Sequence, residues 1–462
     1  MLQCAHRYLR YYDMKKNRLF GTDGIRGRAN IYPMTCDMIQ KFGMAAGYHF
    51  RRDGHRNRVV IAKDTRLSGY MVEMALASGF ISVGFDVIMV GPMPTPSVSF
   101  LIKSLRADLG VMISASHNPY HDNGLKLFGP DGNKINDEIE DKLQDLMLNY
   151  DFHKVMVSPE DLGRAKRLED AQGRYIEHAK RAFPKGIDLS GLRIAIDCAN
   201  GAAYQLAPTI LWELGAEVIK VGVEPDGFNI NHNCGSTHPE AIVQKVLETR
   251  ADIGISLDGD ADRLVICDEK GQVIHGDHLI GMIAANMYHN GHLSSDEVVV
   301  TQMSNTALDE YLGKVGVKLH RTQVGDRYVS EKMQEIGANF GAEQSGHIIL
   351  SHYSATGDGL IAALQVLSIL VKSKKKMSQI GRPFILNPQV TKNVKYSSIN
   401  PLEADSVQRS LEEIQKRESN CKVLVRKSGT EKLIRILVEG VDRYKVEGLA
   451  EEITGLLSSS AN

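Results

Sequence analysis

Two short segments of the chain carry side chains that could perform covalent chemistry. Ser116 stands in the run Ile113-Ser-Ala-Ser-His-Asn-Pro119, and much further along the chain reads Asp258-Gly-Asp-Ala-Asp262. A serine hydroxyl can carry a phosphoryl group, and clustered carboxylates can hold the divalent cation that neutralises such a group. The two segments together therefore predict phosphoryl transfer through a phosphoserine.

The residues around Ser116 predict a tight turn. Because a proline follows Asn118, the backbone at Asn118 is disfavoured from helical geometry. We therefore expect the strand over residues 109–114 to end in a turn that exposes the Ser116 hydroxyl. His117 and His121 have the spacing of two helical metal ligands, but the intervening proline argues against a continuous helix and hence against a metal there.

The three aspartates Asp258, Asp260 and Asp262 follow an apolar strand over residues 253–257. In extended geometry their alternation would place all three carboxylates on one face. Oxygen ligands of this kind suit Mg²⁺, which would keep a coordination position for a phosphoryl oxygen on Ser116.

A calcium-binding EF-hand loop is the main alternative for this segment, because Glu269 falls at the twelfth place of such a loop. Arg263 occupies the sixth place, where an EF-hand needs glycine, and the flanking residues predict strands rather than helices. Both features argue against the EF-hand.

Cations near these segments could bind a phosphate. Lys126 follows the serine turn and can reach back as a point charge, and Arg263 directly follows the aspartates. His275 and His278 could suggest a second metal, but Asp277 as a helix N-cap explains that segment more simply.

Two further loops have polar side chains suited to a sugar phosphate. Gly341-Ala-Glu343-Gln-Ser345-Gly-His347 could hydrogen-bond vicinal hydroxyls, although a plain polar turn has the same composition. Arg426-Lys-Ser428-Gly429-Thr430-Glu431 joins two expected strands and could cradle a dianion, with a polar hairpin loop as the alternative.

Composition excludes several classes of protein. At 462 residues the chain is long enough for three or four domains, at about 150 residues each. A net charge of −1 gives no field that would attract nucleic acid or an anionic membrane. Six scattered cysteines without a Cys-x-x-Cys pair fit reduced thiols in the cytoplasm, and no apolar run is long enough to cross a bilayer.

A repeated strand–helix–strand pattern predicts the fold class. Each copy has a Val/Ile-rich strand, a helix, a glycine and a second strand, which is typical of parallel strands buried on both faces. We therefore expect three similar α/β domains with mixed, mainly parallel sheets and a smaller C-terminal α+β domain around a central cleft. The copies begin at the strands 58–62, 192–197 and 297–301.

The expected domains are residues 1–165 with the serine turn, 166–268 with the aspartates, 269–382 with the sugar loop and 383–462 with the phosphate loop. Residues 1–13 read as an extension, with translation beginning at Met14 as one possibility. The lysines between 372 and 376 read as a solvated helix end before a linker at Pro383 and Pro388.

These segments, together with Phe20-Gly-Thr-Asp-Gly-Ile-Arg-Gly27, resemble the α-D-phosphohexomutase superfamily over nearly the whole chain from Leu19 to about Gly455. The resemblance is greatest to members that act on glucosamine phosphates. It implies four domains around a central cleft, the last of them a phosphate-binding lid. The sequence departs from the usual motif at Lys432, where the family has proline, and at Ala342, where glycine is frequent.

The resemblance implies interconversion of glucosamine 6-phosphate and glucosamine 1-phosphate through phosphoserine 116, one Mg²⁺ and a bisphosphorylated sugar intermediate, in the supply of UDP-N-acetylglucosamine for the cell wall. Glucose or mannose phosphates are the alternative substrates. The implied metal ligands are the Ser116 phosphate, Asp258, Asp260 and Asp262. The implied catalytic residues are Ser116, Lys126, Arg26, Arg263 and His347, and the implied substrate contacts are Glu343, Ser345, Arg426, Ser428, Gly429 and Thr430.

His347 and Lys126 are both candidates for the general base, and the sequence does not choose between them. A non-catalytic phosphosugar sensor on the same scaffold is the second alternative, although such a protein would be expected to lose Ser116 or an aspartate. We expect a small-molecule phosphosugar as the partner, with no nucleic acid and no membrane. A homodimer is one option for the assembly, which the sequence does not fix.

Overall fold

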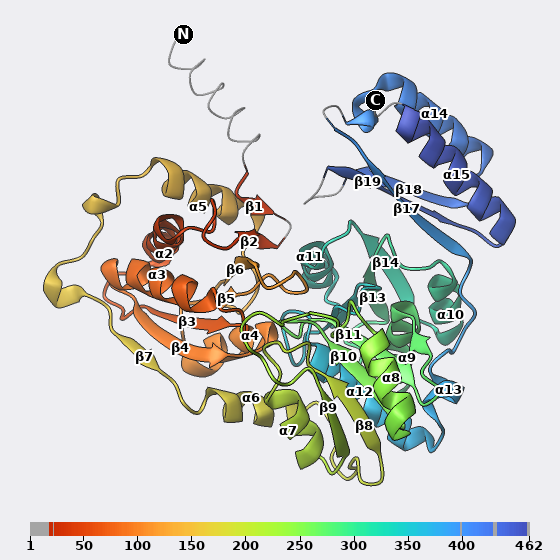
Figure 1. Cartoon of the computed structure of the whole chain (residues 1–462), viewed down its shortest axis with the longest axis horizontal. Coiled ribbons are helices and arrows are strands. Elements are labelled where there is room, and N and C mark those ends of the chain that lie inside the picture. The colour runs from red at the N-terminus through yellow and green to blue at the C-terminus, as the bar shows by residue number, and fades with distance from the viewer. Residues whose placement is uncertain (1–17, 22, 398–399, 428–431, 460–462) are drawn as a thin grey trace.

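The computed structural model describes residues 18–21, 23–397, 400–427 and 432–459, and within these ranges the chain forms four β-sheets. We number the unit built on each sheet domain 1 to domain 4 in chain order. Figure 1 shows domain 1 at the left, domains 2 and 3 together at the lower right, and domain 4 above domain 3. Three α/β units and a smaller α+β unit confirm the predicted fold class. The expected N-terminal extension lies outside the described residues.

Domain 1 has a seven-stranded sheet with helices on both faces. Its elements are β1 (Phe20–Gly21), β2 (Gly24–Arg28), α2 (Cys36–Phe50), β3 (Arg58–Lys63), α3 (Gly69–Ser82), β4 (Asp86–Pro92), α4 (Thr95–Leu105), β5 (Leu109–Ile113), β6 (Asp122–Phe128), α5 (Asp137–Asn149) and β7 (Ala165–Arg167). The strand order is β1-β2-β6-β5-β3-β4-β7, and β3 pairs in parallel with both β4 and β5. Side chains of α2, α3 and α5 join one buried cluster, whereas those of α4 join another that continues into domains 2 and 3.

Domain 2 has a five-stranded sheet in the order β12-β11-β10-β8-β9. Helix α6 leads into it from domain 1, and β8 pairs in parallel with β9 and β10. The elements are α6 (Ala171–Lys180), β8 (Arg193–Asp197), α7 (Leu206–Glu213), β9 (Glu217–Val221), α8 (Glu240–Thr249), β10 (Ile253–Leu257), β11 (Leu264–Asp268) and β12 (Val273–Ile274).

Domain 3 has a four-stranded sheet in the order β14-β13-β15-β16. Its elements are α9 (Gly276–His289), β13 (Glu297–Thr301), α10 (Ala307–Val315), β14 (Lys318–Thr322), α11 (Asp326–Ile336), β15 (Phe340–Ala342), β16 (Ile348–Leu350), α12 (Gly359–Ser373) and α13 (Met377–Ile380). Domain 4 packs two helices on a three-stranded antiparallel sheet in the order β17-β19-β18, with β17 (Gln389–Lys395), α14 (Asp405–Arg417), β18 (Lys422–Lys427), β19 (Leu433–Glu439) and α15 (Arg443–Ser459).

The predicted repeat is confirmed in all three α/β domains. β3, α3 and β4 form one copy, β8, α7 and β9 the second, and β13, α10 and β14 the third, and the two strands of each copy pair in parallel. The first strand of each copy is buried along nearly its whole length. Runs of branched apolar residues are therefore explained by helices covering both faces of each sheet.

Two local expectations change. The lysine-rich stretch does end helix α12, with Lys374 in the left-handed conformation of a C-cap, but the short helix α13 follows it before the expected linker. Asp277 is not an N-cap, because helix α9 begins at Gly276, one residue before it. The N-cap is His275, whose side chain accepts the hydrogen bond from the Asp277 amide. The Asp277 carboxylate is buried and accepts from the Asn305 amide at 2.8 Å, a distant partner that a local pattern does not reveal.

The sheets also bear on where the domains meet in the chain. β7 pairs with β4 and so extends the first sheet to Arg167, past the boundary expected at residue 165. β12 pairs with β11 and extends the second sheet to Ile274, past the boundary expected at residue 268. Both elements are two- or three-residue edge strands, which leave little periodicity in the sequence.

Domain 4 is joined to domain 3 by a buried carboxylate. Glu439, at the end of β19, accepts hydrogen bonds from the Thr306 amide at 2.6 Å and the Thr306 hydroxyl at 2.5 Å, just before helix α10. Lys422 of β18 donates to the Ser304 carbonyl at 2.6 Å. A carboxylate at a helix N-terminus satisfies amides that lack helical partners, so this contact fixes the base of the domain that carries Arg426.

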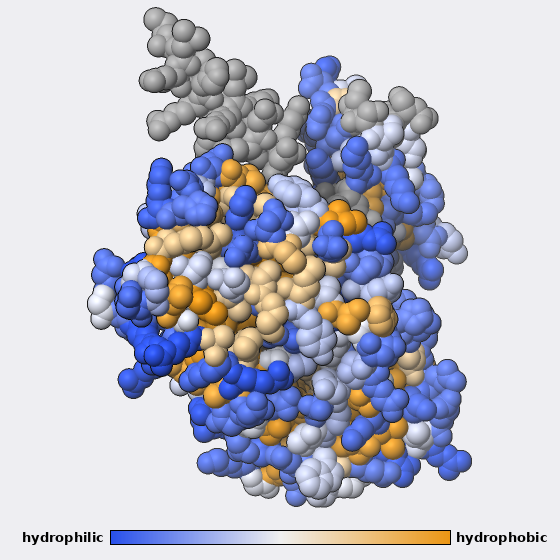
Figure 2. Space-filling view, turned by 60° about the vertical axis from the view of Figure 1, so that its left-hand side comes forward, coloured by the Kyte–Doolittle hydropathy of each residue, from blue (hydrophilic) through white to orange (hydrophobic). Residues whose placement is uncertain are grey.

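The described part of the chain contains no helix that is both long and apolar enough to cross a membrane. Figure 2 shows hydrophilic side chains over most of one face of the molecule, with apolar side chains in smaller patches between them.

Candidate active site

The serine turn follows β5, as expected, and holds Ser116 in the left-handed backbone region with φ at 51°. The Ser116 amide donates to the Ser114 hydroxyl at 2.9 Å, and the Ser116 hydroxyl donates to Asp258 Oδ2 at 2.6 Å. A non-glycine residue with positive φ is uncommon and marks a turn that its surroundings hold in place. The two predicted segments therefore meet, although they are far apart in the sequence.

The prediction that the Ser116 hydroxyl would be exposed is wrong, because Ser116 is only 1% exposed. The aspartate loop packs directly over the turn. A Cβ atom placed on Gly259 would lie 2.6 Å from the Ser116 carbonyl oxygen, so only glycine permits this approach.

The three aspartates converge, but not in the extended geometry that we expected. After β10 ends at Leu257, the chain turns, with Ala261 at a φ of 57° and its amide bonded to the Asp258 carbonyl at 3.0 Å. One oxygen of each carboxylate lies within 4.8 Å of the others. An extended strand would separate alternate residues by about 7 Å, too far for one cation, so the turn is what makes a common site.

The donor set of this cluster fits a hard divalent cation. All three aspartates are buried, and Asp260 Oδ1 and Asp262 Oδ1 have no hydrogen-bond partner. Burial, together with the charges of Asp262 and Asp260, raises the pKa of Asp258 well above its usual range. Mg²⁺ prefers oxygen ligands with free lone pairs, and its positive charge would relieve the repulsion among the three carboxylates.

The EF-hand alternative is not supported by the position of Glu269. Its carboxylate bonds the Ser378 hydroxyl at 2.5 Å and the Ser378 amide at 3.0 Å, on the segment that holds α13. The Glu269 carboxylate therefore binds to helix α13 rather than to the aspartate loop.

Lys126 enters the aspartate cluster from β6. Its ammonium lies 2.8 Å from Asp260 Oδ2, 3.2 Å from Asp262 Oδ2 and 3.0 Å from Asp23 Oδ2, and its side chain is 1% exposed. Burial alone would lower the pKa of Lys126, but the three carboxylates outweigh it and raise the pKa well above its usual range. Lys126 is therefore a permanent positive charge beside the serine. Thr95 adds a hydrogen bond to Asp260 Oδ2 at 2.5 Å.

Two partly buried arginines flank the same point. Arg26 of β2 pairs with Asp23 at 2.5 Å, and the Arg263 amide donates to Asp258 Oδ1 at 3.1 Å. The Nε atoms of Arg26 and Arg263 are buried without a hydrogen-bond partner. Guanidinium donors left free in this way are suited to an anion.

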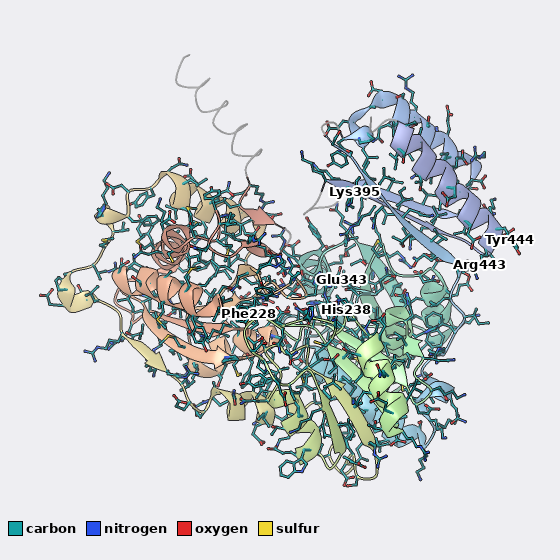
Figure 3. All side chains as sticks on the ribbon, viewed as in Figure 1. Phe228, His238, Glu343, Lys395, Arg443 and Tyr444 are labelled. Carbon is teal, nitrogen blue, oxygen red and sulfur yellow. The ribbon has the colours of Figure 1, made fainter. Side chains whose placement is uncertain are left out.

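The predicted sugar loop connects β15 and β16 and lies where the first three domains meet (Figure 3). Glu343 Oε1 accepts from the Gly325 amide at 3.1 Å, and burial raises the pKa of Glu343. Ser345 is exposed at the tip of the loop. A β-bridge between Arg263 and His347 ties the loop to the aspartate segment.

His347 is buried between the loops. Its Nε2 accepts from the Gly357 amide at 3.1 Å and lies 3.5 Å from Asp326, and its Nδ1 lies 3.7 Å from Asp262. Burial alone would lower the pKa of His347, but Asp262 and Asp326 outweigh it and raise the pKa. Because both ring nitrogens face protein groups, these contacts favour an orienting or charge-neutralising role over that of a general base.

The structure describes only part of the predicted phosphate loop. Arg426 lies on β18, half-buried, with its Nε atom unpartnered. Burial and the charge of Arg435 on the neighbouring strand lower the pKa of Arg426, whereas Glu343 of the sugar loop raises it. Arg426 therefore interacts electrostatically with Glu343 of domain 3. Ser428, Gly429 and Thr430 lie outside the described residues. Lys432 bonds the Ser397 carbonyl at 3.2 Å.

Sequence reasoning missed the residue that holds the serine turn. The Arg66 guanidinium is fully buried, pairs with Asp64 at 2.8 Å and donates to the carbonyls of Ser116 at 2.9 Å and Asn118 at 2.8 Å. It also donates to the carbonyls of Pro119 and Asp122. One signal was available: Arg66 follows β3 as Ser116 follows the neighbouring parallel strand β5, so both lie at the same sheet edge.

The two histidines of the serine turn face different groups. His117 Nδ1 lies 3.2 Å from the Ser116 hydroxyl, and burial, with Arg263 and Arg26 nearby, lowers the pKa of His117 to about 4. His121 is partly exposed and faces Asp122 instead.

Arg66→Met should destabilise the fold and impair the turn. Removing one partner of a buried ion pair leaves Asp64 uncompensated, which costs about 3–5 kcal/mol in the free energy of unfolding. Urea unfolding measures this change. Arg56→Met, which removes an exposed ion pair with Asp86, serves as the control and should change little. A loss of stability no greater than that of the control would contradict the role of Arg66.

Comparison with known proteins agrees with this geometry. Four family models, described as the alpha/beta/alpha domains I, II and III and the C-terminal domain of phosphoglucomutase/phosphomannomutase, match residues 17–154, 173–271, 275–384 and 390–456. Curated proteins named phosphoglucosamine mutase from Azorhizobium caulinodans and Phenylobacterium zucineum are each 55% identical to the chain. They cover 96% and 97% of this chain, and the matches span 99% and 100% of their own length.

Solved structures show the same fold at low sequence identity. A phosphoglucomutase/phosphomannomutase family protein from Burkholderia thailandensis superposes with a TM-score of 0.81 at 23% identity, covering 96% of this chain and 98% of its own. The Paramecium phosphoglucomutase parafusin superposes with a TM-score of 0.71 at 18% identity, covering 96% of each chain. Given all four domain models and relatives 55% identical over nearly its full length, this chain belongs to the phosphoglucomutase/phosphomannomutase family of the α-D-phosphohexomutase superfamily.

Proposed function

We propose that this protein is a phosphoglucosamine mutase, which interconverts glucosamine 6-phosphate and glucosamine 1-phosphate. The substrate class comes from relatives of that name that are 52–55% identical over at least 96% of the chain. The observation that carries the chemistry is the 2.6 Å hydrogen bond from the Ser116 hydroxyl to Asp258, within a cluster of three buried carboxylates.

In the proposed reaction, the enzyme begins with a phosphoryl group on Ser116. The free hydroxyl of the bound sugar monophosphate attacks phosphorus, an O–P bond forms to the sugar, and the O–P bond to Ser116 breaks while the hydroxyl proton is lost to a base. The resulting bisphosphorylated sugar turns around in the site. Its other phosphoryl group then returns to Ser116, which leaves the isomeric monophosphate.

Asp258, Asp260 and Asp262 would hold Mg²⁺, which when bound neutralises charge on the transferring group. Lys126, Arg26 and Arg263 would supply positive charge at the same point. Lys126 is buried and the two arginines are partly buried, which would strengthen their interaction with a phosphoryl oxygen. The general base stays open between His347 and Lys126. The contacts of both ring nitrogens and the raised pKa of Lys126 favour neither as a free base in this form.

The sugar would be held between two loops. Glu343 and Ser345 would contact its hydroxyls, and Arg426, with Ser428, Gly429 and Thr430, would hold the phosphate that does not react. Because the sugar binds in two orientations, this second set must recognise the dianion rather than the sugar itself. The unpartnered Arg426 Nε atom supports such a role.

The cellular location and the assembly of the protein are also proposals. The cysteines among the described residues are all free, which supports a reducing compartment such as the cytoplasm. A homodimer stays one option for the assembly. Glucose or mannose phosphate as the preferred substrate is the alternative within the family. A non-catalytic sensor is less supported, because Ser116 and the three aspartates are all present.

A direct comparison of substrates tests this function. Purified full-length enzyme should turn over glucosamine 1-phosphate with a kcat/KM at least about tenfold above that for glucose 1-phosphate or mannose 1-phosphate, because a site adapted to the amino group would discriminate against sugars that carry a hydroxyl there. Coupled assays with the three sugars under one set of conditions make this measurement. A preference for glucose or mannose would transfer the assignment to the alternative.

Asp260→Asn should weaken the response to Mg²⁺. In the wild-type protein, Mg²⁺ should raise both turnover and Tm, since a ligand that binds only the folded state stabilises it. The variant should need at least about tenfold more Mg²⁺ for either effect, because it loses one of three carboxylates. Asp296→Asn, an exposed aspartate before β13, is the matched control. An unchanged Mg²⁺ titration in Asp260→Asn would remove this residue from the metal site.

A further inference from the structure

A second cluster of charged side chains, largely shielded from solvent, lies beside the candidate active site, where domain 1 meets domain 3. The Lys134 ammonium lies between two carboxylates, 2.6 Å from Asp23 Oδ1 and 2.5 Å from Asp326 Oδ2. Their side chains are 13%, 18% and 11% exposed, respectively. Lys134 and Asp23 belong to domain 1, whereas Asp326 is the first residue of helix α11 in domain 3. Lys134 therefore bridges the two domains.

Each carboxylate that Lys134 contacts also contacts a residue of the candidate site. Asp23 pairs with Arg26 at 2.5 Å and with Lys126 at 3.0 Å. Asp326 lies 3.5 Å from His347 Nε2. The contacts form a ring of charges from three domains, because both Lys126 and His347 reach Asp262 of domain 2, at 3.2 Å and 3.7 Å.

The lysine is needed electrostatically, because the two carboxylates repel each other. Burial alone would raise the pKa of Asp326, and the charge of Asp23 adds to this, yet Lys134 together with His347 outweighs both and lowers the pKa of Asp326. Without the ammonium, two buried like charges would face each other across the domain boundary, an arrangement that proteins relieve by separation or protonation.

We propose that Lys134 is a positioning residue for phosphoryl transfer. By bridging Asp23 and Asp326, it fixes the separation between domain 1, which carries Ser116 and its cations, and domain 3, which carries the sugar loop. This inference rests on the proposed function, since it states that the ring of charges aligns the phosphoryl donor with the phosphoryl acceptor. Shifts of about 1 Å in such alignment cost about 100-fold in rate.

A neighbouring contact should let the Lys134 variant fold. Arg327, next to Asp326, pairs with Asp137 at 2.7 Å and Glu140 at 3.3 Å on helix α5 of domain 1. Arg18 reaches the same two carboxylates at 2.7 Å and 3.2 Å. This second bridge does not touch Asp23 or His347, so it can hold the domains together while leaving the active-site groups unanchored.

Lys134→Met tests the proposal in the full-length enzyme. It should lower kcat about 100-fold and leave KM nearly unchanged, because substrate contacts remain while the reacting groups lose alignment. Hydrogen exchange should become faster over residues 343–347, because His347 contacts Asp326, which Lys134 no longer holds in place. Lys134→Arg, which keeps the charge, should recover most of both properties. Lys332→Met, which removes an exposed ion pair with Glu335 on the same helix, should behave as wild type.

A double variant separates positioning from general stability. If Lys134 acts through Asp326, Lys134→Met combined with Asp326→Asn should have a kcat no lower than the worse single variant, since residues that act together are not additive. Effects on kcat that multiply would overturn the proposal. Unchanged hydrogen exchange over residues 343–347 in Lys134→Met, with kcat lost only in proportion to unfolded protein, would also overturn it. The exchange readout needs no substrate, so it stands even if wild-type enzyme fails to convert glucosamine phosphates.

Discussion

Mutual repulsion of three buried carboxylates is the constraint on which the rest of this structure depends. Asp258, Asp260 and Asp262 lie within 4.8 Å of one another at a depth where water cannot screen them. Two neighbouring groups reduce this repulsion: Lys126 neutralises part of the charge, and the Ser116 hydroxyl donates a hydrogen bond to Asp258. Two carboxylate oxygens still have no hydrogen-bond partner. A site that gathers negative charge so closely is poised for a divalent cation and a phosphoryl group together.

The fold brings these groups together by joining the ends of strands from three similar domains. Ser116 follows β5, the aspartates follow β10, and Glu343 follows β15, so each domain contributes the loop after a core strand. Rigid sheets behind short loops hold such groups more firmly than long loops would. Polar contacts then bridge the domains. The Lys134–Asp326 ion pair joins the first and third domains, and Glu439 accepts a hydrogen bond from the Thr306 amide between the third and fourth.

Sequence reasoning captured what is local and missed what depends on distant partners. Unbroken runs of Val and Ile predicted the three repeats, because a strand buried on both faces requires apolar residues at consecutive positions. The motif residues around Ser116 and Asp258 predicted a shared site. The burial of Ser116 and the roles of Arg66 and Lys134 depend on groups 50 or more positions away, such as Asn118 for Arg66 and Asp326 for Lys134, which no spacing rule connects. Ser428 to Thr430 stay predictions.

The most direct measurement follows the phosphoryl group itself. Enzyme carrying a labelled phosphoryl group is mixed with one equivalent of unlabelled glucosamine 6-phosphate, and the label is located by mass analysis of the protein and the sugars. The account predicts that the label starts on Ser116, passes to the bisphosphorylated sugar and is absent from Ser116→Ala, which does not turn over. Full turnover by enzyme that never carries a phosphoryl group on Ser116 would contradict it.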